Sequence, residues 1–418
     1  MCIRDSHNMI VHGIKENSVQ FYHQLIQVFF VGITLGTVRT VVPALAEDEF
    51  AVASGSFLLL STFVLSFGVV KACMNFAAGH LSDKFGRKKI LLMGWLLALP
   101  VPLLILYAES WAYIVIATTF LGINQGLTWS ITQTCKIDLA TPGERGFAIG
   151  LNEFSGYIGV SLAGILTGIL VTNYDLRLSL MIFSLVAILI PIVLTLFLVQ
   201  ETLPWVEGEQ TTSADTLNQS TFDIFKLVTW DNKQMFLITQ AGLIEKFTDT
   251  LVWIFFPLYL YQMHFSLPNI GIIVGIYGVT WGASQFLTGY LSDRIGRKKL
   301  IFSGMLLCSV GSLMCILDST FIWWSISAGI IGFGMALLYP TLSAAVSDLS
   351  EPIWRSTAIG VYRFWRDAGY AFGAFSLGAI ASYTGNIESA FWLVAIIMFA
   401  SGILVGFGSK ETHPDFRN

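Results

Sequence analysis

The sequence predicts an all-α membrane protein with twelve transmembrane helices, arranged as two pseudo-symmetric bundles of six helices. Three observations support this fold class. Hydrophobic residues make up 55% of the 418-residue chain and charged residues only 12%, about half the charged fraction of an ordinary soluble domain. Apolar runs of about 20 residues recur along the chain, and each is long enough to cross a hydrocarbon core about 30 Å thick as a helix. The second half of the chain also repeats the first with a shift of 210 residues.

The apolar ranges follow one another along the chain, and polar or charged stretches separate them. In order, we expect helices at 21–45, 54–79, 90–108, 111–136, 145–172, 178–200, 235–262, 267–289, 300–317, 321–347, 355–384 and 388–408. The acidic residues 47–49 end the first range, the basic loop 79–89 ends the second, and the loop 140–146 ends the fourth. In the second half, the basic loop 289–299 holds the place of loop 79–89.

These ranges define an N-terminal segment, two bundles, a linker between them and a tail. The boundaries that we expect are 1–20, 21–200, 201–234, 235–408 and 409–418. The linker holds six acidic and two basic residues, so we expect it to be solvated, with a surface helix near 221–229. Residues 1–6 resemble the translated end of a sequencing adapter, and we therefore expect the native chain to start at Met9 or upstream of it.

The repeat is clearest in one charged loop. GHLSDKFGRKK at 79–89 returns as GYLSDRIGRKK at 289–299. The same shift aligns Asp138 with Asp348, Arg145 with Arg355, and the run Ala148-Ile149-Gly150 with Ala358-Ile359-Gly360. A constant register at such separated points is hard to obtain by chance, so we infer that one ancestral half was duplicated.

Basic residues concentrate in alternate loops, which predicts the orientation in the membrane. The loops on one side contain Lys84, Arg87, Lys88, Lys89, Arg145, Lys226, Lys233, Arg294, Arg297, Lys298, Lys299, Arg355, Lys410 and Arg417. By the positive-inside rule this side is cytoplasmic, with both termini inside. The net charge of −4 says little about partners, because the linker and the outer acidic loop set its sign.

The repeated pattern G-x-L-S-D-x-x-G-R-K-K resembles the signature loop of the major facilitator superfamily. The resemblance covers essentially the whole chain, since the helix count, the central linker and the half-repeat also fit. It implies the fold of that superfamily and secondary transport by a monomer in a prokaryotic inner membrane. It indicates no substrate, because the superfamily moves sugars, drugs, peptides, anions and metabolites.

The repeated loop also has a physical interpretation. Gly86 and Gly296 permit a tight reversal between two helices, while Asp83 and Asp293 can cap a helix or pair with a base. The alternative is that the basic residues only enforce topology. The resemblance implies a latch between the halves, so we expect Arg87 to pair with Asp138, and Arg297 with Asp348, when the inner side is closed. The candidate cytoplasmic gate contains Gly79, Asp83, Gly86, Arg87, Asp138, Arg145, Gly289, Asp293, Gly296, Arg297, Asp348 and Arg355.

Charged residues also lie within the expected helices, where each costs about 2.5–3.5 kcal/mol near the middle of a bilayer. They must therefore face a cavity or one another. The four helices that the resemblance places on the outside, at 90–108, 178–200, 300–317 and 388–408, carry no charge in their apolar cores. The candidate substrate and proton pathway contains Arg39, Lys71, Gln125, Lys136, Glu153, Glu245, Lys246, Asp249, Arg363, Arg366 and Asp367.

Helical spacing lets some of these charges neutralise each other. Glu245 and Asp249 are four residues apart, Lys246 and Asp249 three, and Arg363 and Asp367 four. One interpretation is that such pairs merely lower the cost of insertion.

The repeat favours a functional interpretation. The shift of 210 residues places Arg39 on Asp249 and Glu153 on Arg363, so equivalent positions carry opposite charges. We expect these positions to approach one another across the cavity. Glu153 or Asp249 is the predicted proton-titrating group, and Arg39, Arg363 and Arg366 are the predicted contacts of an anionic group.

We therefore expect a secondary active transporter of a small polar or charged organic solute, driven by alternating access and coupled to protons. The alternatives are a drug or metabolite exporter acting as a proton antiporter, a uniporter or anion exchanger, and a transporter-like sensor without flux. The exporter is disfavoured because Gly122 stands where drug antiporters of the superfamily carry an arginine.

Nothing in the sequence indicates an enzyme. No phosphate-binding Gly-rich loop is present, and neither the six histidines nor the five cysteines have metal-ligand spacing. We expect no cofactor or metal other than a proton or ion gradient, and no nucleic acid among the partners. The cysteines are expected to pack in apolar segments rather than form disulfides.

Overall fold

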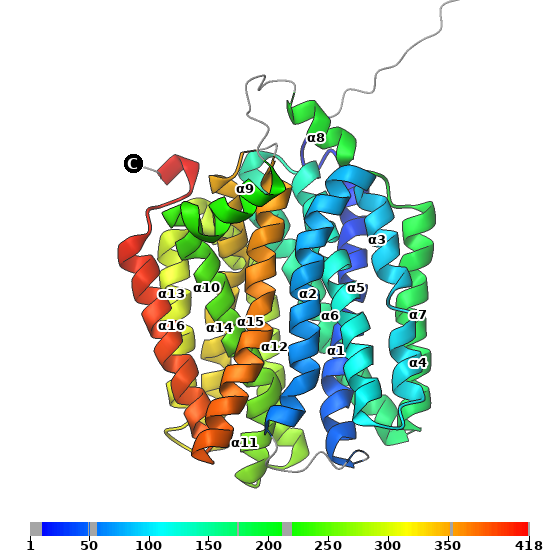
Figure 1. The fold of residues 1–418 in the computed structure, drawn as a ribbon, viewed down its shortest axis with the longest axis vertical. Coiled ribbons are helices and arrows are strands. Elements are labelled where there is room, and N and C mark those ends of the chain that lie inside the picture. Colours follow the sequence, from blue (N-terminus) through cyan, green and yellow to red (C-terminus); the bar gives the residue numbers. More distant parts are fainter. Residues whose placement is uncertain are drawn as a thin grey trace, which may run out of the picture.

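The computed structural model describes residues 11–48, 50, 57–173, 175–210, 220–351 and 354–416. Within these ranges the chain is built from helices and contains no strand. Figure 1 shows the long helices packed side by side and running roughly parallel to one axis. Residues 1–10, which include the proposed adapter segment and Cys2, lie outside the described part.

The first half supplies six membrane helices, one of which is divided. Its elements are α1 (Ser18–Asp48), α2 (Phe57–Phe85), α3 (Arg87–Leu96), α4 (Pro100–Leu106), α5 (Trp111–Leu139), α6 (Arg145–Asn173) and α7 (Leu176–Phe197). The range 90–108 was expected as one helix, and the structure breaks it between α3 and α4. Pro100 explains the break, since its nitrogen carries no hydrogen and a proline is best tolerated in the first turn of a helix.

The second half repeats this arrangement. Its elements are α10 (Lys233–Thr250), the π-helical turn η3 (Leu251–Phe255), α11 (Phe256–Gln262), α12 (Leu267–Ile295), α13 (Lys298–Met314), α14 (Phe321–Leu349), α15 (Arg355–Thr384) and α16 (Glu388–Gly408). The expected helix 235–262 is thus present but contains a π-helical turn. Pro257 follows that turn and cannot donate the backbone bond that would continue a regular α-helix.

The described helices include eight stretches that are long and apolar enough to cross a membrane. They are Ser18–Arg39, Ser61–Phe85, Arg87–Leu106, Trp111–Leu139, Leu180–Phe197, Asn269–Ile295, Phe321–Leu349 and Glu388–Gly408. Helices α10 and α15 are less apolar because each carries three buried charged side chains. Helix α13 has only 17 residues. With α3–α4 and α10–α11 each counted as one, the described ranges contain the predicted twelve membrane helices.

The linker contains the short helices α8 (Leu203–Gln210) and α9 (Thr221–Lys226) and a π-helical turn, η2 (Leu227–Asp231). The surface helix expected near 221–229 is therefore present. Figure 1 places α8 and α9 at the same end of the molecule as the C-terminal segment. We call this the linker end.

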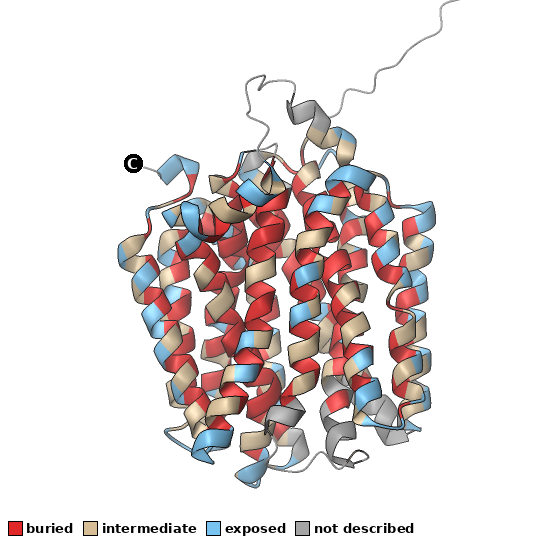
Figure 2. Ribbon diagram, in the orientation of Figure 1, coloured by how far each residue is buried: buried red, intermediate tan, exposed pale blue. Residues whose placement is uncertain are grey.

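The halves meet along two helix pairs, α2 with α15 and α6 with α12. Figure 1 shows α2 and α15 side by side in the middle of the molecule. Figure 2 shows that buried residues face the interior of the bundle, while exposed residues dominate its periphery. The region between the halves is therefore part of the packed interior.

Candidate functional site

The predicted pathway charges are nearly all buried. Nine of the ten are classed as buried, and the side chain of the tenth, Arg39, is 15% exposed. Burying so many charges is costly unless each group finds a partner of opposite charge and hydrogen bonds. The partners therefore determine how the halves are held together.

The first ion pair joins the two halves at the positions related by the repeat. Arg39 on α1 places Nη2 2.8 Å from Oδ1 of Asp249 on α10, as the sequence predicts. Asp249 also accepts hydrogen bonds from the hydroxyls of Tyr277, at 3.2 Å, and Tyr370. Nζ of Lys246 lies 3.7 Å away. The carboxylate of Asp249 is therefore fully partnered.

A second set of contacts centres on Asp367 of α15. Its Oδ2 lies 3.4 Å from Nζ of Lys71 on α2 and accepts a 2.6 Å hydrogen bond from Nδ2 of Asn75. Its Oδ1 accepts a 2.9 Å bond from Nε of the adjacent Arg366. The halves are therefore joined by a second buried ion pair, between α2 and α15.

Arg363 and Asp367, whose spacing would allow them to neutralise each other, form no ion pair among the described residues. Asp367 is turned towards α2, whereas Arg363 donates from Nη1 to the side-chain oxygen of Gln133 on α5. Arg363 therefore also connects the halves, but through an uncharged amide.

The expected approach of Glu153 to Arg363 does not produce an ion pair among the described residues. Glu153 on α6 instead accepts hydrogen bonds from Trp129 Nε1 at 2.9 Å and from Asn152 Nδ2 at 2.8 Å. Its partners lie within its own half, which explains why the symmetry argument failed here.

Glu245 on α10 differs from the other acids. Its side chain is fully buried, and neither carboxylate oxygen accepts a hydrogen bond from any described residue. The nearest cation is Lys246, whose Nζ lies 4.0 Å from Oε1. Lys246 lies closer to Asp249 than to Glu245. Of the buried acids Glu153, Glu245, Asp249 and Asp367, Glu245 is therefore the least stabilised.

Aromatic rings surround the cations. Nζ of Lys246 lies 4.3 Å, and the guanidinium carbon of Arg366 4.4 Å, from the centre of the Tyr339 ring. The guanidinium carbon of Arg39 lies 4.2 Å from the Trp253 ring centre. Such contacts stabilise a desolvated cation by about 2 kcal/mol.

Two of the predicted pathway residues bind within the first half. Lys136 donates from Nζ to the backbone oxygen of Gln24 at 2.9 Å, and Gln125 donates to the backbone oxygen of Val31, also at 2.9 Å. Both acceptors lie on α1, so these residues stabilise the packing of α5 on α1.

The gate residues form the same network in each half. Arg87 Nη1 lies 2.6 Å from Asp83 Oδ1, and Arg87 Nε lies 3.2 Å from Asp138 Oδ2. In the second half the corresponding distances are 2.7 Å from Arg297 to Asp293 and 2.9 Å from Arg297 to Asp348. The predicted pairs are therefore present, and each lies within one half. Arg145 and Arg355 begin α6 and α15.

One further acid belongs to each network and was not among the predicted gate residues. Glu201 accepts bonds from the backbone nitrogens of Arg87, at 2.8 Å, and Lys88, at 3.2 Å. Glu411 accepts from Arg297, at 2.8 Å, and from Lys298, at 3.1 Å. The sequence repeat relates these two acids as well, because Glu201 and Glu411 are also 210 residues apart. Burial alone would raise the pKa of Glu411, but its backbone hydrogen bonds lower it below its ordinary value.

Glycines shape both loops. Gly86 and Gly296 have φ angles of 94° and 92°, which other residues rarely adopt. The predicted tight reversals are therefore present, and they bring each arginine back towards the aspartate four residues before it.

The halves are in close backbone contact at the linker end. A Cβ atom added to Gly289 on α12 would lie 2.7 Å from the backbone oxygen of Gly146 on α6. One added to Gly150 would lie 2.8 Å from the backbone oxygen of Gln285. The carboxylate of Asp293 also lies against Gly146, so the loop of one half contacts a helix start in the other. The linker end is therefore closed between α6 and α12.

The second helix pair is also close at this end. A Cβ added to Gly360 on α15 would lie 3.3 Å from the backbone oxygen of Asn75 and 3.6 Å from Cα of Gly79, both on α2. The 3.3 Å separation is tighter than most Cβ contacts but longer than the 2.7 Å and 2.8 Å found at Gly289 and Gly150, so at this end the contact is less tight than that of α6 with α12.

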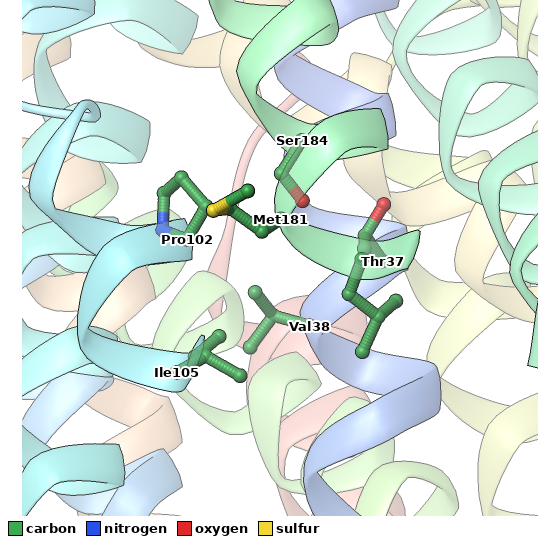
Figure 3. Close-up of a pocket in the computed structure, with 7 residues that line it drawn as sticks. Thr37, Val38, Pro102, Ile105, Met181 and Ser184 are labelled. Atoms are coloured by element: carbon green, nitrogen blue, oxygen red, sulfur yellow. The ribbon is translucent and has the colours of Figure 1, made fainter. Parts of the chain in front are cut away.

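A small cavity lies within the first half. Figure 3 shows Thr37 and Val38 of α1 facing Pro102 and Ile105 of α4, with Met181 of α7 between them. About 10 Å³ is open to the centre of a water molecule, which is at the lower limit for holding one water. This cavity is too small for a solute, and none of its lining residues is charged.

The described cysteines are free thiols. Cys135, Cys308 and Cys315 are buried, and Cys73 is exposed on α2. No group of metal-binding side chains was found in the described part of the chain.

Comparisons with known proteins identify the family. The model of the Major Facilitator Superfamily matches residues 25–244 and again 238–417. The inner membrane transport protein YajR of Escherichia coli K12 is 34% identical over 133 residues, which are 31% of this chain and 28% of YajR. A probable 4-methylmuconolactone transporter of Cupriavidus pinatubonensis is 24% identical, covering 86% of this chain and 87% of that protein.

A solved structure has the same fold. The proton:xylose symporter XylE superposes with a TM-score of 0.73 at 16% sequence identity, covering 95% of this chain and 97% of XylE. The match extends over both halves of the chain. The chain therefore belongs to the major facilitator superfamily and is a membrane transporter of that kind.

Proposed function

We propose that this protein is a proton-coupled secondary active transporter of a small polar or charged organic solute. It works by alternating access in a prokaryotic cytoplasmic membrane, as a monomer with both termini in the cytoplasm. The main support for the proposal is that two buried ion pairs join the halves, Arg39 with Asp249 and Lys71 with Asp367.

Ion pairs between two rocking halves provide a physical basis for coupling. When the halves separate on one side of the membrane, water enters, and charges that had been paired become free to bind a solute or a proton. When the halves close again, the same charges must be neutralised, because unpaired buried charges cost several kcal/mol. Closure therefore requires either the ion pairs or a bound ligand.

Glu245 is the acid that the geometry favours as the proton site, ahead of the predicted Glu153 and Asp249. An ionised carboxylate without hydrogen bonds is poorly stabilised in a dry interior, so the closed state favours its neutral form. Opening to water would let it ionise. The groups within electrostatic reach of Glu245 are Lys246 and Asp249 on α10, Tyr362, Arg366 and Asp367 on α15, and Cys308 on α13.

Two similar proteins support a small organic solute. One relative is a probable 4-methylmuconolactone transporter, and XylE is a proton:xylose symporter.

Uptake into proteoliposomes tests the proposal. Vesicles with an imposed pH gradient are incubated with a metabolite extract, and the retained solutes are identified by mass spectrometry. We expect at least one small polar solute to accumulate only when the gradient is present. Glu245→Gln should abolish accumulation while leaving the protein folded. Glu351→Gln, at an exposed position, should leave accumulation unchanged.

Other outcomes distinguish the alternatives. Accumulation that is independent of the pH gradient would indicate a uniporter or an exchanger. Binding of a solute without any flux would indicate a sensor.

A further inference from the structure

We propose that the charged cluster binds the carboxylate of a small ring-containing organic acid, with Arg363 as the principal contact. The inference rests on the proposed transport function and assigns its solute to a chemical class. Its evidence is the charge balance, the unused hydrogen-bond donors and the aromatic surroundings of the cluster.

The cluster between the halves holds more bases than acids. The five bases are Arg39, Lys71, Lys246, Arg363 and Arg366, and the four acids are Glu153, Glu245, Asp249 and Asp367. Lys136 is left out because it binds within the first half; counting it would add a sixth base, and leaving out Glu153, whose partners also lie within its own half, would remove an acid, so either choice increases the excess of bases. One positive charge therefore lacks an acidic counterpart even when every acid is ionised, and an anionic ligand would balance it.

Among the described residues, Arg363 is the base of this cluster that forms no ion pair with an acid, whereas Arg39, Lys71, Lys246 and Arg366 each do. Its side chain is buried, with 1% of the residue exposed, and its one hydrogen bond goes to the amide oxygen of Gln133. Nε and Nη2 of Arg363 have no acceptor among the described residues. A guanidinium offers its donors in a planar fork that matches the two oxygens of a carboxylate.

Neighbouring donors are also unused. Nη1 of Arg366, Nε2 of Gln133 and Nζ of Lys246 are buried and make no hydrogen bond with the described residues. Arg366 lies one helical turn from Arg363 on α15, and Gln133 contacts Arg363 directly. Several donors without acceptors favour a ligand that accepts hydrogen bonds, which a carboxylate does with both oxygens.

The aromatic residues indicate what the carboxylate is attached to. Tyr339 lies against both Lys246 and Arg366, and its ring centre is 5.4 Å from that of Trp281 and 6.0 Å from that of Tyr157. These rings come from both halves. When the halves part, the flat faces that the cations now cover would become available to a ring on the ligand.

A sugar fits this arrangement less well. A neutral polyol would leave the excess charge uncompensated, although its hydroxyls could occupy some of the donors. A cyclic or aromatic monocarboxylate fits better, because its charge balances the excess of bases, its oxygens accept hydrogen bonds from the unused donors, and its ring can contact the aromatic side chains.

Equilibrium binding to the purified full-length protein tests the inference without requiring transport. Benzoate is the probe, benzyl alcohol is its uncharged analogue, and inorganic phosphate is an anion without a ring. We expect wild-type protein to bind benzoate, and to bind benzyl alcohol and phosphate at least about tenfold more weakly. Arg363→Gln should raise the Kd for benzoate at least about tenfold.

Two further variants make the result interpretable. Arg294→Gln removes the same kind of charge from an exposed position at the linker end and should leave benzoate binding unchanged. Arg363→Lys keeps the charge but loses the planar fork, so its Kd for benzoate should lie between that of wild type and the value expected for Arg363→Gln. This variant provides the test if Arg363→Gln does not fold.

Three results would overturn the inference: equal benzoate affinity in wild type and Arg363→Gln, tighter binding of phosphate than of benzoate, or no benzoate binding by wild type. Proton-driven uptake of an uncharged solute would overturn the inference and leave the proposed function standing.

Discussion

Replacing Gly289 with alanine should open the linker end. The new methyl group would lie 2.7 Å from the backbone oxygen of Gly146 and 3.2 Å from Cα of Gly150, both on the opposite half. Backbone atoms cannot move aside as a flexible side chain can, so α6 and α12 must separate by several tenths of an ångström. Overpacking of this kind costs about 1–3 kcal/mol, and only the closed state incurs it. The ratio of open to closed molecules should therefore rise about 5- to 150-fold.

Spin labels at two exposed positions related by the repeat can measure this change. His80→Cys on α2 and Tyr290→Cys on α12 place one label on each half, in a chain whose exposed Cys73 is replaced by serine. Pulsed electron spin resonance should show a longer label-to-label distance gaining population in Gly289→Ala.

Gly275→Ala is the matched control, because it lies on the same helix and its Cβ would meet nothing within 4 Å. Identical distance distributions in Gly289→Ala and Gly275→Ala would refute the claim that this contact closes the linker end.

Two further predictions concern stability. Glu411→Gln should lower the free energy of unfolding by about 1–2 kcal/mol at pH 7, since a charged acceptor of four backbone N–H groups becomes neutral while remaining partly exposed. Its depressed pKa means that this stabilisation is present above the ordinary value of 4.5 and lost as the pH falls through the lower folded-state value. Thermal unfolding of wild type should therefore depend more steeply on pH below about 4.5 than that of Glu411→Gln; parallel profiles would contradict this. Asp249→Asn should destabilise by about 3–5 kcal/mol, because Arg39 loses its partner, and adding Arg39→Gln should restore part of the loss; strictly additive effects would show that the pair is not coupled.

The positions of the helices could be predicted because an apolar run of membrane length is directly visible in the sequence. The expected and observed ranges differ mainly where the chain deviates from a regular helix, before Pro100 and before Pro257. Proline is visible in a sequence, but whether it kinks, divides or merely starts a helix depends on the packing around it.

The site was only partly predictable. The opposite charges at Arg39 and Asp249 predicted a contact that the structure contains, because both side chains point between the halves. The same argument failed for Glu153, since Trp129 supplies a nearer partner inside its own half. Hydrogen-bond partners of this kind depend on side-chain direction, which a repeat in the sequence does not specify.

Glu201 and Glu411 illustrate a different limitation. The two acids are related by the shift of 210 residues. Glu201 lies in a segment that its composition identifies as a linker, and Glu411 lies in the C-terminal tail. Their function as acceptors for the backbone N–H groups of Arg87 and Arg297 becomes evident only when the fold brings each acid beside a loop that lies 114 residues earlier in the chain. A systematic comparison of the two halves would have found them.

Simultaneous measurement of solute and proton movement in the same proteoliposomes tests the central claim most directly. A pH-sensitive dye inside the vesicles reports protons while the solute identified by uptake is followed by its label. We predict that solute and protons move in a fixed ratio in wild type, and that Glu245→Gln abolishes the proton movement. Solute movement without any accompanying proton, or an unchanged ratio in Glu245→Gln, would contradict the account.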